Sequence, residues 1–498
     1  MRHLSKSKII AYRQCPKRLW LEVHRRELRD DSKSQVAFKI GNEVGDVARA
    51  IYDPDEEGEL IDIGVLGFEE AFSRSQKLLA EGSGVVCEAG VRAKGALAFA
   101  DVMIPEGKGE SLKWHMIEVK SSTSVKDYHR DDVAVQTYVA ESAGVSLSSV
   151  SLAHINNEFV YQGDGIYQGL LKEEDLTEEA KARQDEVIEW IGGAQKVAAS
   201  DHEPEVETGE HCSSPFSCPF SAYCNRDKPV AEYPLSSLPR LSAAKRMEIE
   251  AIGISDLREV PDDLLSTQQG WVKQQTLLGE VSFDAEGAAA DLADHGFPAY
   301  FLDFETVNLA VPIWKGTRPY QQIPFQYSLH RVDAAGEMAH EAFLDLSGED
   351  PSEALAQALI EQCGEVGPVF AYNAGFEKMV MQYLATRFPE WSQELESIIS
   401  RVVDLLPIAR ERYYHPDQHG SWSLKAVLPS VCPDLSYDDL EGVADGGMAV
   451  EVFKEAIAAE TSQQRKAEIE EQLLKYCQLD TLALVRMWEV FRGTNNGV

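Results

Sequence analysis

The stretch Ala299-Tyr-Phe-Leu-Asp-Phe-Glu305 has the pattern of a buried strand that carries two acids. Because strand side chains alternate with a period of two, Asp303 and Glu305 share one face, and the residues around them are apolar. Burying an unpaired carboxylate is costly. An Asp-x-Glu inside an apolar strand therefore indicates a metal site or a paired charge, and it marks the start of an α/β region.

Two later segments complete a series of acids. The segment Val369-Phe-Ala-Tyr-Asn-Ala-Gly-Phe-Glu377 predicts a strand followed by the start of a helix, and Tyr476-Cys-Gln-Leu-Asp480 puts Tyr and Asp one helical turn apart on one face. The order Asp-x-Glu, Asn-x-x-Phe-acid, Tyr-x-x-x-Asp resembles the DEDD exonucleases of the ribonuclease H-like fold, in the subgroup with Tyr in its last motif.

That resemblance implies a role for each residue. Asp303, Glu305 and Asp480 would bind the metal ions, Mg²⁺ or Mn²⁺, and Tyr476 would orient the attacking water. The family carries Asp as its third acid, whereas this chain has Glu377 at the matching position. Asp404 is the alternative, either assisting Glu377 or replacing it. Taken alone, Tyr476 also fits an ordinary core aromatic of a helix.

The first half of the chain carries a second acidic pattern. Asp101 follows the apolar strand Ala96-Leu-Ala-Phe-Ala100, and the strand Trp114-His-Met-Ile-Glu-Val-Lys120 puts Glu118 and Lys120 on one face. Asp101, Glu118 and the carbonyl of Val119 would hold Mg²⁺ or Mn²⁺, which prefer oxygen ligands. Lys120 would orient water or stabilise developing charge. By itself this pattern also fits a solvated strand edge.

Asp followed by Glu-x-Lys resembles the PD-(D/E)XK nuclease superfamily, whose fold is that of the restriction endonucleases. Gln136 lies where the RecB-like branch carries a glutamine on a helix. Many members also have a metal-binding His in a Gly-x-x-x-His motif, but Gly41-Asn-Glu-Val-Gly45 ends in Gly. Glu43 or Asp46 would then supply the remaining ligand, unless both are helix-surface carboxylates.

Four of the eight cysteines form a separate pattern. Cys15 lies in Tyr12-Arg-Gln-Cys-Pro-Lys-Arg-Leu-Trp20, and five residues separate each neighbouring pair of Cys212, Cys218 and Cys224. In a chain without a secretory signal, clustered cysteines indicate metal binding more than disulfides. The pattern resembles RecB-like nucleases with a 4Fe-4S cluster, such as the CRISPR-associated adaptation nuclease, and implies that these four cysteines bind one. Structural zinc, with His211 as a further ligand, and unligated thiols are the alternatives, although zinc usually takes close Cys-x-x-Cys pairs.

The length of 498 residues predicts two to four domains. We expect an α/β protein with a RecB-like nuclease and iron-sulfur cluster in residues 1–228. A helical linker would follow in 229–285, and a DEDD-type 3′-5′ exonuclease of the ribonuclease H-like fold in 286–498. The whole chain resembles bacterial proteins that join these two modules.

The formal net charge of -36 argues against nonspecific binding of polyanions over the whole surface. Between Arg2 and Arg29, however, nine Lys or Arg stand against two Glu, so a nucleic-acid path could be confined to such patches. Without a secretory signal or an apolar run of roughly 20 residues, the chain is expected in the cytoplasm and not in a membrane.

Together these features predict a metal-dependent DNA nuclease with two active sites. It would act on single strands or DNA ends, in DNA repair or in defence against mobile elements, with DNA favoured over RNA as its partner. The alternatives are an RNA-processing exonuclease and a DNA-binding protein with one inactive site.

Overall fold

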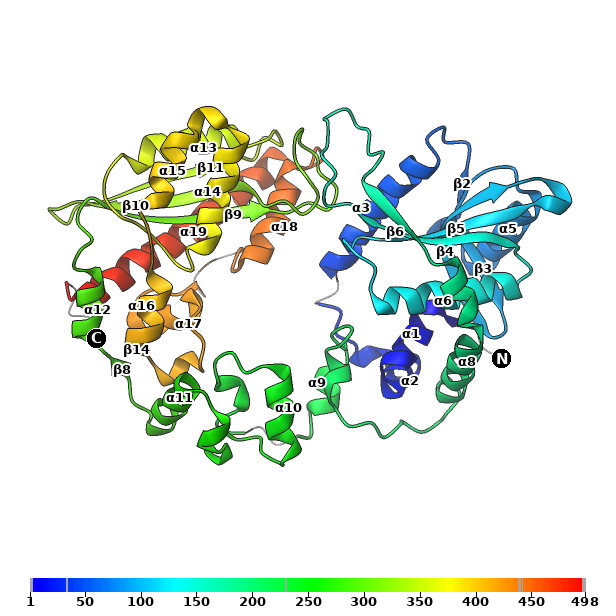
Figure 1. The fold of residues 1–498 in the computed structure, drawn as a ribbon, viewed down its shortest axis with the longest axis horizontal. Coiled ribbons are helices and arrows are strands. Elements are labelled where there is room, and N and C mark those ends of the chain that lie inside the picture. The colour runs from blue at the N-terminus through cyan, green and yellow to red at the C-terminus, as the bar shows by residue number, and fades with distance from the viewer. Residues whose placement is uncertain (1–2, 33–34, 229–230, 438–439, 441, 495–498) are drawn as a thin grey trace. The chain divides into compact units, whose positions relative to one another are not determined.

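The computed structural model describes residues 3–32, 35–228, 231–437, 440 and 442–494 (Figure 1). The protein is α/β with mixed sheets, and its internal contacts divide it into two units. The first unit comprises Met1–Lys228 with Leu309–Tyr320, and the second comprises Pro229–Asn308 with Gln321–Val498. Within the described part of the chain, no helix has the length and apolar character needed to cross a membrane.

The first unit is built on a seven-stranded sheet in the order β2-β3-β4-β5-β6-β7, with β1 pairing to β4. Strands β3, β4 and β5 form an antiparallel meander, β6 runs parallel to β5, and β7 returns antiparallel to β6. The strands are β1 (Leu4–Ser5), β2 (Glu59–Leu60), β3 (Val86–Ala93), β4 (Ala96–Glu106), β5 (Lys113–Lys120), β6 (Leu147–Ile155) and β7 (Leu171–Asp175).

Strand β1 determines what lies beside the acidic strand β4. It pairs with Ala96 and Leu97, whereas β5 pairs with the stretch from Val102 to Glu106. Since β3 occupies the other edge of β4, β1 and β5 share one edge. Asp101 therefore lies between them, and the residue that follows β1 is Lys6.

Helices cover the sheet of the first unit. Helix α6 packs against β3, β4 and β6 through apolar residues such as Val133 and Val139, whereas α3 contacts β4 and β5. The helices are α1 (Lys6–Gln14), α2 (Pro16–His24), α3 (Gln35–Tyr52), α4 (Ile63–Leu66), α5 (Phe68–Glu81), α6 (Asp127–Ser142), α7 (Thr177–Ala182), α8 (Gln184–Ala198) and α9 (Ser221–Asn225), with short 3-10 helices at Arg26–Leu28, Gly109–Ser111 and Glu210–Cys212.

The second unit is built on a five-stranded sheet in the order β11-β10-β9-β12-β13. Strands β9, β10 and β11 are antiparallel, and β12 and β13 continue the sheet parallel to β9. A two-stranded sheet pairs β8 with β14. The strands are β8 (Ser282–Phe283), β9 (Ala299–Val307), β10 (Ile323–Val332), β11 (Met338–Leu344), β12 (Val369–Ala371), β13 (Val402–Asp404) and β14 (Tyr413–Tyr414).

The alternation predicted for β9 separates two cores. Ala299 and Phe301 belong to the core that includes helix α19, whereas Tyr300, Leu302 and Phe304 belong to the core with α13, α14 and α15. The helices are α10 (Ala243–Ala251), α11 (Thr267–Leu278), α12 (Ala285–Leu292), α13 (Ser352–Cys363), α14 (Gly375–Arg387), α15 (Ser392–Ser400), α16 (Leu405–Arg412), α17 (Leu424–Val431), α18 (Gly446–Ile457) and α19 (Gln463–Arg492), with short 3-10 helices at Leu235–Ser237, Leu257–Glu259, Asp262–Leu264, Pro389–Trp391 and Pro416–Gln418.

The helical segment expected as a linker over 229–285 belongs to the second unit. Val272 lies in the same core as α19, and the hydroxyls of Thr276 and Tyr414 are hydrogen-bonded at 2.7 Å. Leu235, Ile249 and Val260 add a small core of their own. The main segment of the first unit ends at Lys228.

One boundary differs from the expected organisation. The segment Leu309–Tyr320, between β9 and β10, belongs to the first unit and not to the region 286–498. Its backbone exchanges two hydrogen bonds with Tyr161, at 3.0 Å from the Tyr161 amide to Thr317 and at 2.8 Å from the Gly316 amide to Tyr161. The Tyr320 hydroxyl also donates to the carbonyl of Ser121. These hydrogen bonds join the segment to the first unit, and its sequence does not indicate them.

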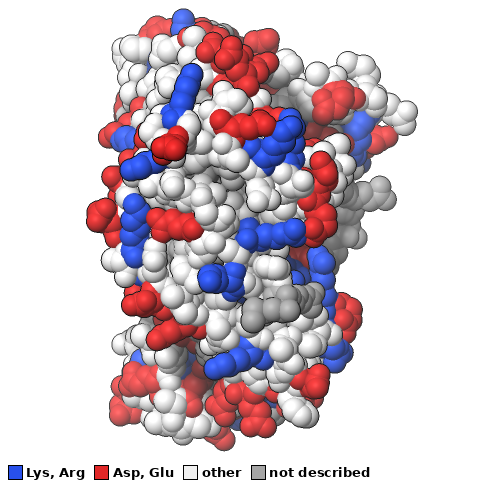
Figure 2. Space-filling view, turned by 90° about the vertical axis from the view of Figure 1, so that its right-hand side faces the viewer, with Lys and Arg blue, Asp and Glu red and all other residues white. Residues whose placement is uncertain are grey.

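The basic amino-terminal segment is largely neutralised by acids. Ion pairs of the first unit join its cations to carboxylates from near and far in the chain, among them Arg13 to Asp131 at 3.2 Å and Lys17 to Glu203 at 2.7 Å. Further pairs involve Lys6, Arg18, Arg25 and Arg29. Figure 2 shows basic and acidic side chains interspersed over one face of the molecule. The segment is therefore not a simple basic patch.

Candidate functional site

The acids predicted in the second half of the chain come together. Carboxylate oxygens of Asp303 and Glu305, from β9, and of Asp480, from α19, all lie within 4.8 Å of one another. The alternation of β9 turns its two acids to the side on which α19 packs. Asp480 follows Tyr476 by one turn on the buried face of that helix. Hard divalent cations take oxygen ligands of this kind.

The pKa values of these three carboxyls are raised, which favours a bound cation. Burial, followed by the charges of Asp480 and Glu305, raises the pKa of Asp303 well above its ordinary value. Burial and the charge of Asp480 raise the pKa of Glu305 to about 8, and burial raises the pKa of Asp480 to about 6. Buried like charges oppose ionisation unless a positive charge compensates them. The donor set therefore fits Mg²⁺ or Mn²⁺.

Of the two candidates for the third acid, Glu377 faces the set. It lies in the first turn of α14, is 3% exposed, and its Oε2 has no hydrogen-bond partner. Its charge contributes to the raised pKa of Asp303, and burial raises its own pKa to about 7. Asp404 instead caps α16, where its Oδ1 accepts from the amides of Leu406 and Asn373 at 2.9 Å each. Its charge still reaches Glu377.

Two tyrosines adjoin the triad, and the sequence pattern predicted only Tyr476. Tyr476 is buried beside it, but the hydroxyl that donates to Asp480 Oδ1 belongs to Tyr437. The ammonium of Lys425 lies 5.0 Å from the ring centre of Tyr437 and 5.1 Å from that of Tyr476. Its charge lowers the raised pKa values of Glu305 and Asp480. No periodic pattern in the sequence marked Tyr437.

The acids predicted in the first half of the chain also come together. Asp101 Oδ2 on β4 accepts from the Val119 amide at 2.6 Å, and Lys120 Nζ donates to Glu118 Oε1 at 2.6 Å. Gln136, fully buried on α6, donates to the Phe99 carbonyl at 2.8 Å. Burial and the charge of Glu118 raise the pKa of Asp101 to about 8.

Three further charged residues join this first cluster. Asp132 on α6 accepts from Lys120 at 2.8 Å, and Lys6 on α1 donates to Glu118 Oε1 at 2.6 Å. Glu88 on β3 acts on Asp101 through its charge, and its φ of 56° puts it in the left-handed region opposite Asp101. The oxygens suit a divalent cation, but two ammonium groups already lie among them. The cluster therefore does not fit a metal ion as readily as the triad.

Both candidates for a ligand from α3 are exposed. Glu43 is exposed on that helix, and its charge acts on Tyr320. Asp46 is likewise exposed and pairs with Arg49. Glu88, whose charge acts on Asp101, is a further candidate for the remaining acid beside Glu43.

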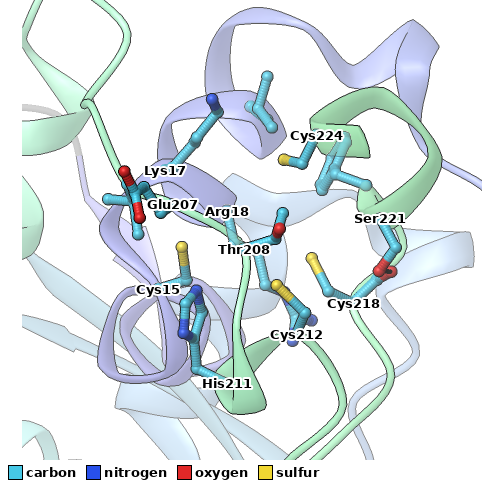
Figure 3. A pocket seen from close by; sticks show the side chains of 13 residues that line it. Cys15, Lys17, Arg18, Glu207, Thr208, His211, Cys212, Cys218, Ser221 and Cys224 are labelled. Carbon is cyan, nitrogen blue, oxygen red and sulfur yellow. Dashed lines mark hydrogen bonds between the residues drawn. The ribbon is translucent and has the colours of Figure 1, made fainter. Parts of the chain in front are cut away.

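The four predicted cysteines line one pocket of the first unit (Figure 3). Cys15 comes from the junction of α1 and α2, and Cys212, Cys218 and Cys224 come from the segment around α9. Gln14 ties the two parts together, since its side-chain amide donates to the carbonyls of His211 at 2.7 Å and Phe216 at 2.6 Å.

Charge and spacing further define the cysteine pocket. Burial raises the pKa of the Cys218 and Cys224 thiols, and the charges of Arg18 and Lys17 oppose the rise. Among the described residues, the triad alone brings three possible ligand atoms within 4.8 Å of one another. Four sulfurs around zinc, at about 2.3 Å from the ion, would lie closer together than this limit. No three of these four thiols therefore lie as close to one another as the sulfurs of a zinc site do.

Two comparisons with known proteins bear on this chain. Residues 300–423 match the family model of a domain of unknown function, DUF2779. This stretch includes Asp303, Glu305, Glu377 and Asp404 but not Asp480. No curated protein matches the chain.

Proposed function

We propose that this protein is a metal-dependent nuclease and that its second unit is a DEDD-type 3′-5′ exonuclease of the ribonuclease H-like fold. The observation that carries the proposal is the buried triad of Asp303, Glu305 and Asp480, with oxygens within 4.8 Å of one another. A bound Mg²⁺ or Mn²⁺ would polarise a phosphodiester and activate water. Such an ion would compensate the repulsion that raises the pKa values of the three buried carboxyls.

The sheet of the second unit supports this assignment. Numbered along the chain, its strands lie in the order 3-2-1-4-5, with three antiparallel strands followed by two parallel ones. The first strand, β9, is central and carries Asp303 and Glu305, and the last helix, α19, brings Asp480 to them. The acids thus lie on a strand and a helix, which fix the relative positions of the carboxylates better than loops would.

The residues around the triad have definable tasks. Glu377, whose Oε2 lacks a partner, is available to accept a hydrogen bond from a water that attacks the phosphodiester. Tyr437 holds Asp480 in place through its hydroxyl. Lys425, between two tyrosine rings, presents a positive charge beside the acids and is suited to a phosphate of the substrate.

For the first unit we propose a RecB-like module of the PD-(D/E)XK type, with Asp101, Glu118, Lys120 and Gln136 as its site. The hydrogen bonds that join Asp101 to β5 and Lys120 to Glu118 support this assignment. The four cysteines line one pocket, and no three of their thiols lie within 4.8 Å of one another, which supports a 4Fe-4S cluster over a single zinc ion because a cluster is larger than one ion. The cations Lys17 and Arg18, which line the same pocket, would offset the negative charge of four thiolates.

We propose DNA single strands or ends as substrate, with a role in repair or defence against mobile elements. End-labelled single-stranded DNA, duplex DNA and RNA, each incubated with Mg²⁺ or Mn²⁺, test this. We expect release of mononucleotides from the 3′ end of DNA, its loss in Asp303→Asn, and its retention in the matched surface variant Glu460→Gln. If the protein trims RNA in preference to DNA, RNA is the substrate and not DNA. Full trimming by Asp303→Asn would refute the assignment of the triad.

A further inference from the structure

The ammonium of Lys6 lies inside the first acidic cluster with a complete set of acceptors. Its Nζ is 2.6 Å from Glu118 Oε1, 3.2 Å from Asp132 Oδ2 and 3.4 Å from Gln136 Oε1. An ammonium has three donors, and three oxygens from β5 and α6 surround it. Burial alone would lower the pKa of Lys6, but the charges of Asp132 and Glu118 outweigh burial and raise it.

Lys6 and Lys120 alternate with Glu118 and Asp132. Each ammonium lies within 3.2 Å of both carboxylates, so every charge of this group of four has two neighbours of opposite sign. The two lysines hold the pKa of Asp132 well below its usual range despite its burial. The charge of these four residues is balanced before any metal ion binds.

The triad of the second unit has a different balance. Asp303, Glu305 and Asp480 all have raised pKa values, as a buried set of like charges should. The cation that acts on the triad, Lys425, donates its hydrogen bond to the carbonyl of Ala444. A divalent cation would therefore gain more at the triad than at the first cluster.

We propose that the Lys6 ammonium is the resident cation of the first acidic cluster, and that a divalent metal ion binds Asp101 and Glu118 only by displacing it. This rests on the proposed assignment of these acids as a nuclease site. Lys6 is then a positioning residue that sets the metal requirement of the first unit, because it competes for Glu118. Glu118 Oε2, buried and without a hydrogen-bond partner, is available to an ion once the Lys6 ammonium beside the same carboxylate has left.

The position of Lys6 in the fold favours a displaceable cation. It is the first residue of α1, directly after β1, and its side chain is 16% exposed. Release of the ammonium toward solvent requires a change of side-chain rotamer and no break in the helix. Lys120, whose side chain is 25% exposed, is the last residue of β5 and belongs to the sheet.

The test measures Mn²⁺ binding directly, by titration with detection of free Mn²⁺ by electron paramagnetic resonance. All proteins carry Asp303→Asn and Asp480→Asn, so that the triad does not contribute. We expect Lys6→Met to bind one Mn²⁺ about ten- to a hundred-fold more tightly than the same background protein with Lys6 intact, because a unit positive charge beside two carboxylates is removed. Lys6→Arg, which keeps the charge, should leave the affinity unchanged.

Lys8→Met is the matched control, since it removes the same charge from the same helix two residues away. Circular dichroism and thermal melting establish that the variants fold, and Lys6→Gln provides a second neutral side chain. Equal, measurable Mn²⁺ affinity in the Lys6 protein and Lys6→Met would overturn the proposal while leaving the metal-site assignment intact. Absence of Mn²⁺ binding in folded Lys6→Met and Lys6→Gln would overturn both. If Lys8→Met gained as much Mn²⁺ affinity as Lys6→Met, the effect would come from the net charge of the protein, and the proposal would be overturned.

Discussion

Replacement of Glu305 by Gln should stabilise the metal-free protein at alkaline pH and abolish its stabilisation by metal. The carboxyl of Glu305 has an ordinary pKa of 4.5, and burial beside Asp480 raises it to about 8. Between these values the folded protein holds a proton that the unfolded chain has released. The stability that this group supports is complete below the unfolded pKa and falls as the pH rises toward 8. Gln cannot ionise, so it removes that loss.

The size of the effect follows from the pKa difference. About 3.5 pH units between the two states, at about 1.36 kcal/mol per unit, give a ceiling of roughly 5 kcal/mol. Asp303 and Asp480 share the same buried space and relieve part of the repulsion by taking up protons themselves. We therefore expect Glu305→Gln to gain on the order of 2–4 kcal/mol at pH 8 and close to nothing at pH 5.

Urea unfolding with EDTA, followed by tryptophan fluorescence from pH 5 to pH 8, measures this gain. Addition of Mn²⁺ at pH 8 should then stabilise the native protein and not Glu305→Gln, because an ion that binds only the folded state adds stability. The exposed Glu460→Gln is the control and should follow the native protein throughout. Destabilisation by Glu305→Gln that is the same at pH 5 and pH 8, or undiminished stabilisation by Mn²⁺, would refute the reasoning.

Further predictions concern the other residues. Protein purified without oxygen should contain about four irons per chain. Cys218→Ala should lose the iron and melt at a lower temperature, whereas Cys87→Ala should keep the iron. Stoichiometric zinc without iron would contradict the iron-sulfur assignment. In 3′ trimming assays, Tyr476→Phe should lose less activity than Asp480→Asn, because a hydroxyl near the triad contributes less than a metal ligand. Equal losses of activity in the two variants would argue against the ligand role of Asp480. Asp101→Asn should remove cleavage by the first unit and leave 3′ trimming unchanged, since the two sets of acids lie in separate units; loss of both would make the triad dependent on the first unit.

Local patterns anticipated much of both acidic sets. Alternation along a strand is a property of the backbone, so Asp303 and Glu305 could be assigned to one face before any packing was known. The same rule joined Glu118 to Lys120. Tyr476 and Asp480 shared a face for the equivalent helical reason. In each case the two residues lie within four positions of one another.

Residues brought in from distant segments escaped prediction. Lys6 lies 112 positions before Glu118, and it joins the cluster because β1 pairs with β4 beside Asp101. Tyr437 lies 43 positions before Asp480, and Asp132 reaches Lys120 only because α6 packs on the sheet. Exposure of Glu43 likewise depends on how α3 lies against β4 and β5. No spacing along the chain carries this information.

The amino-acid pattern was sufficient for the class of the fold, for the strands and helices that bear the acids, and for the grouping of four cysteines. Packing was needed to show that two lysines pair with the acids of the first cluster, and that burial and mutual repulsion raise the pKa values of the triad carboxyls. The two clusters have similar acids in sequence, and they differ in the cations that long-range contacts bring to them. Because electrostatic energy depends on distance in space, charge balance is a property of the folded chain.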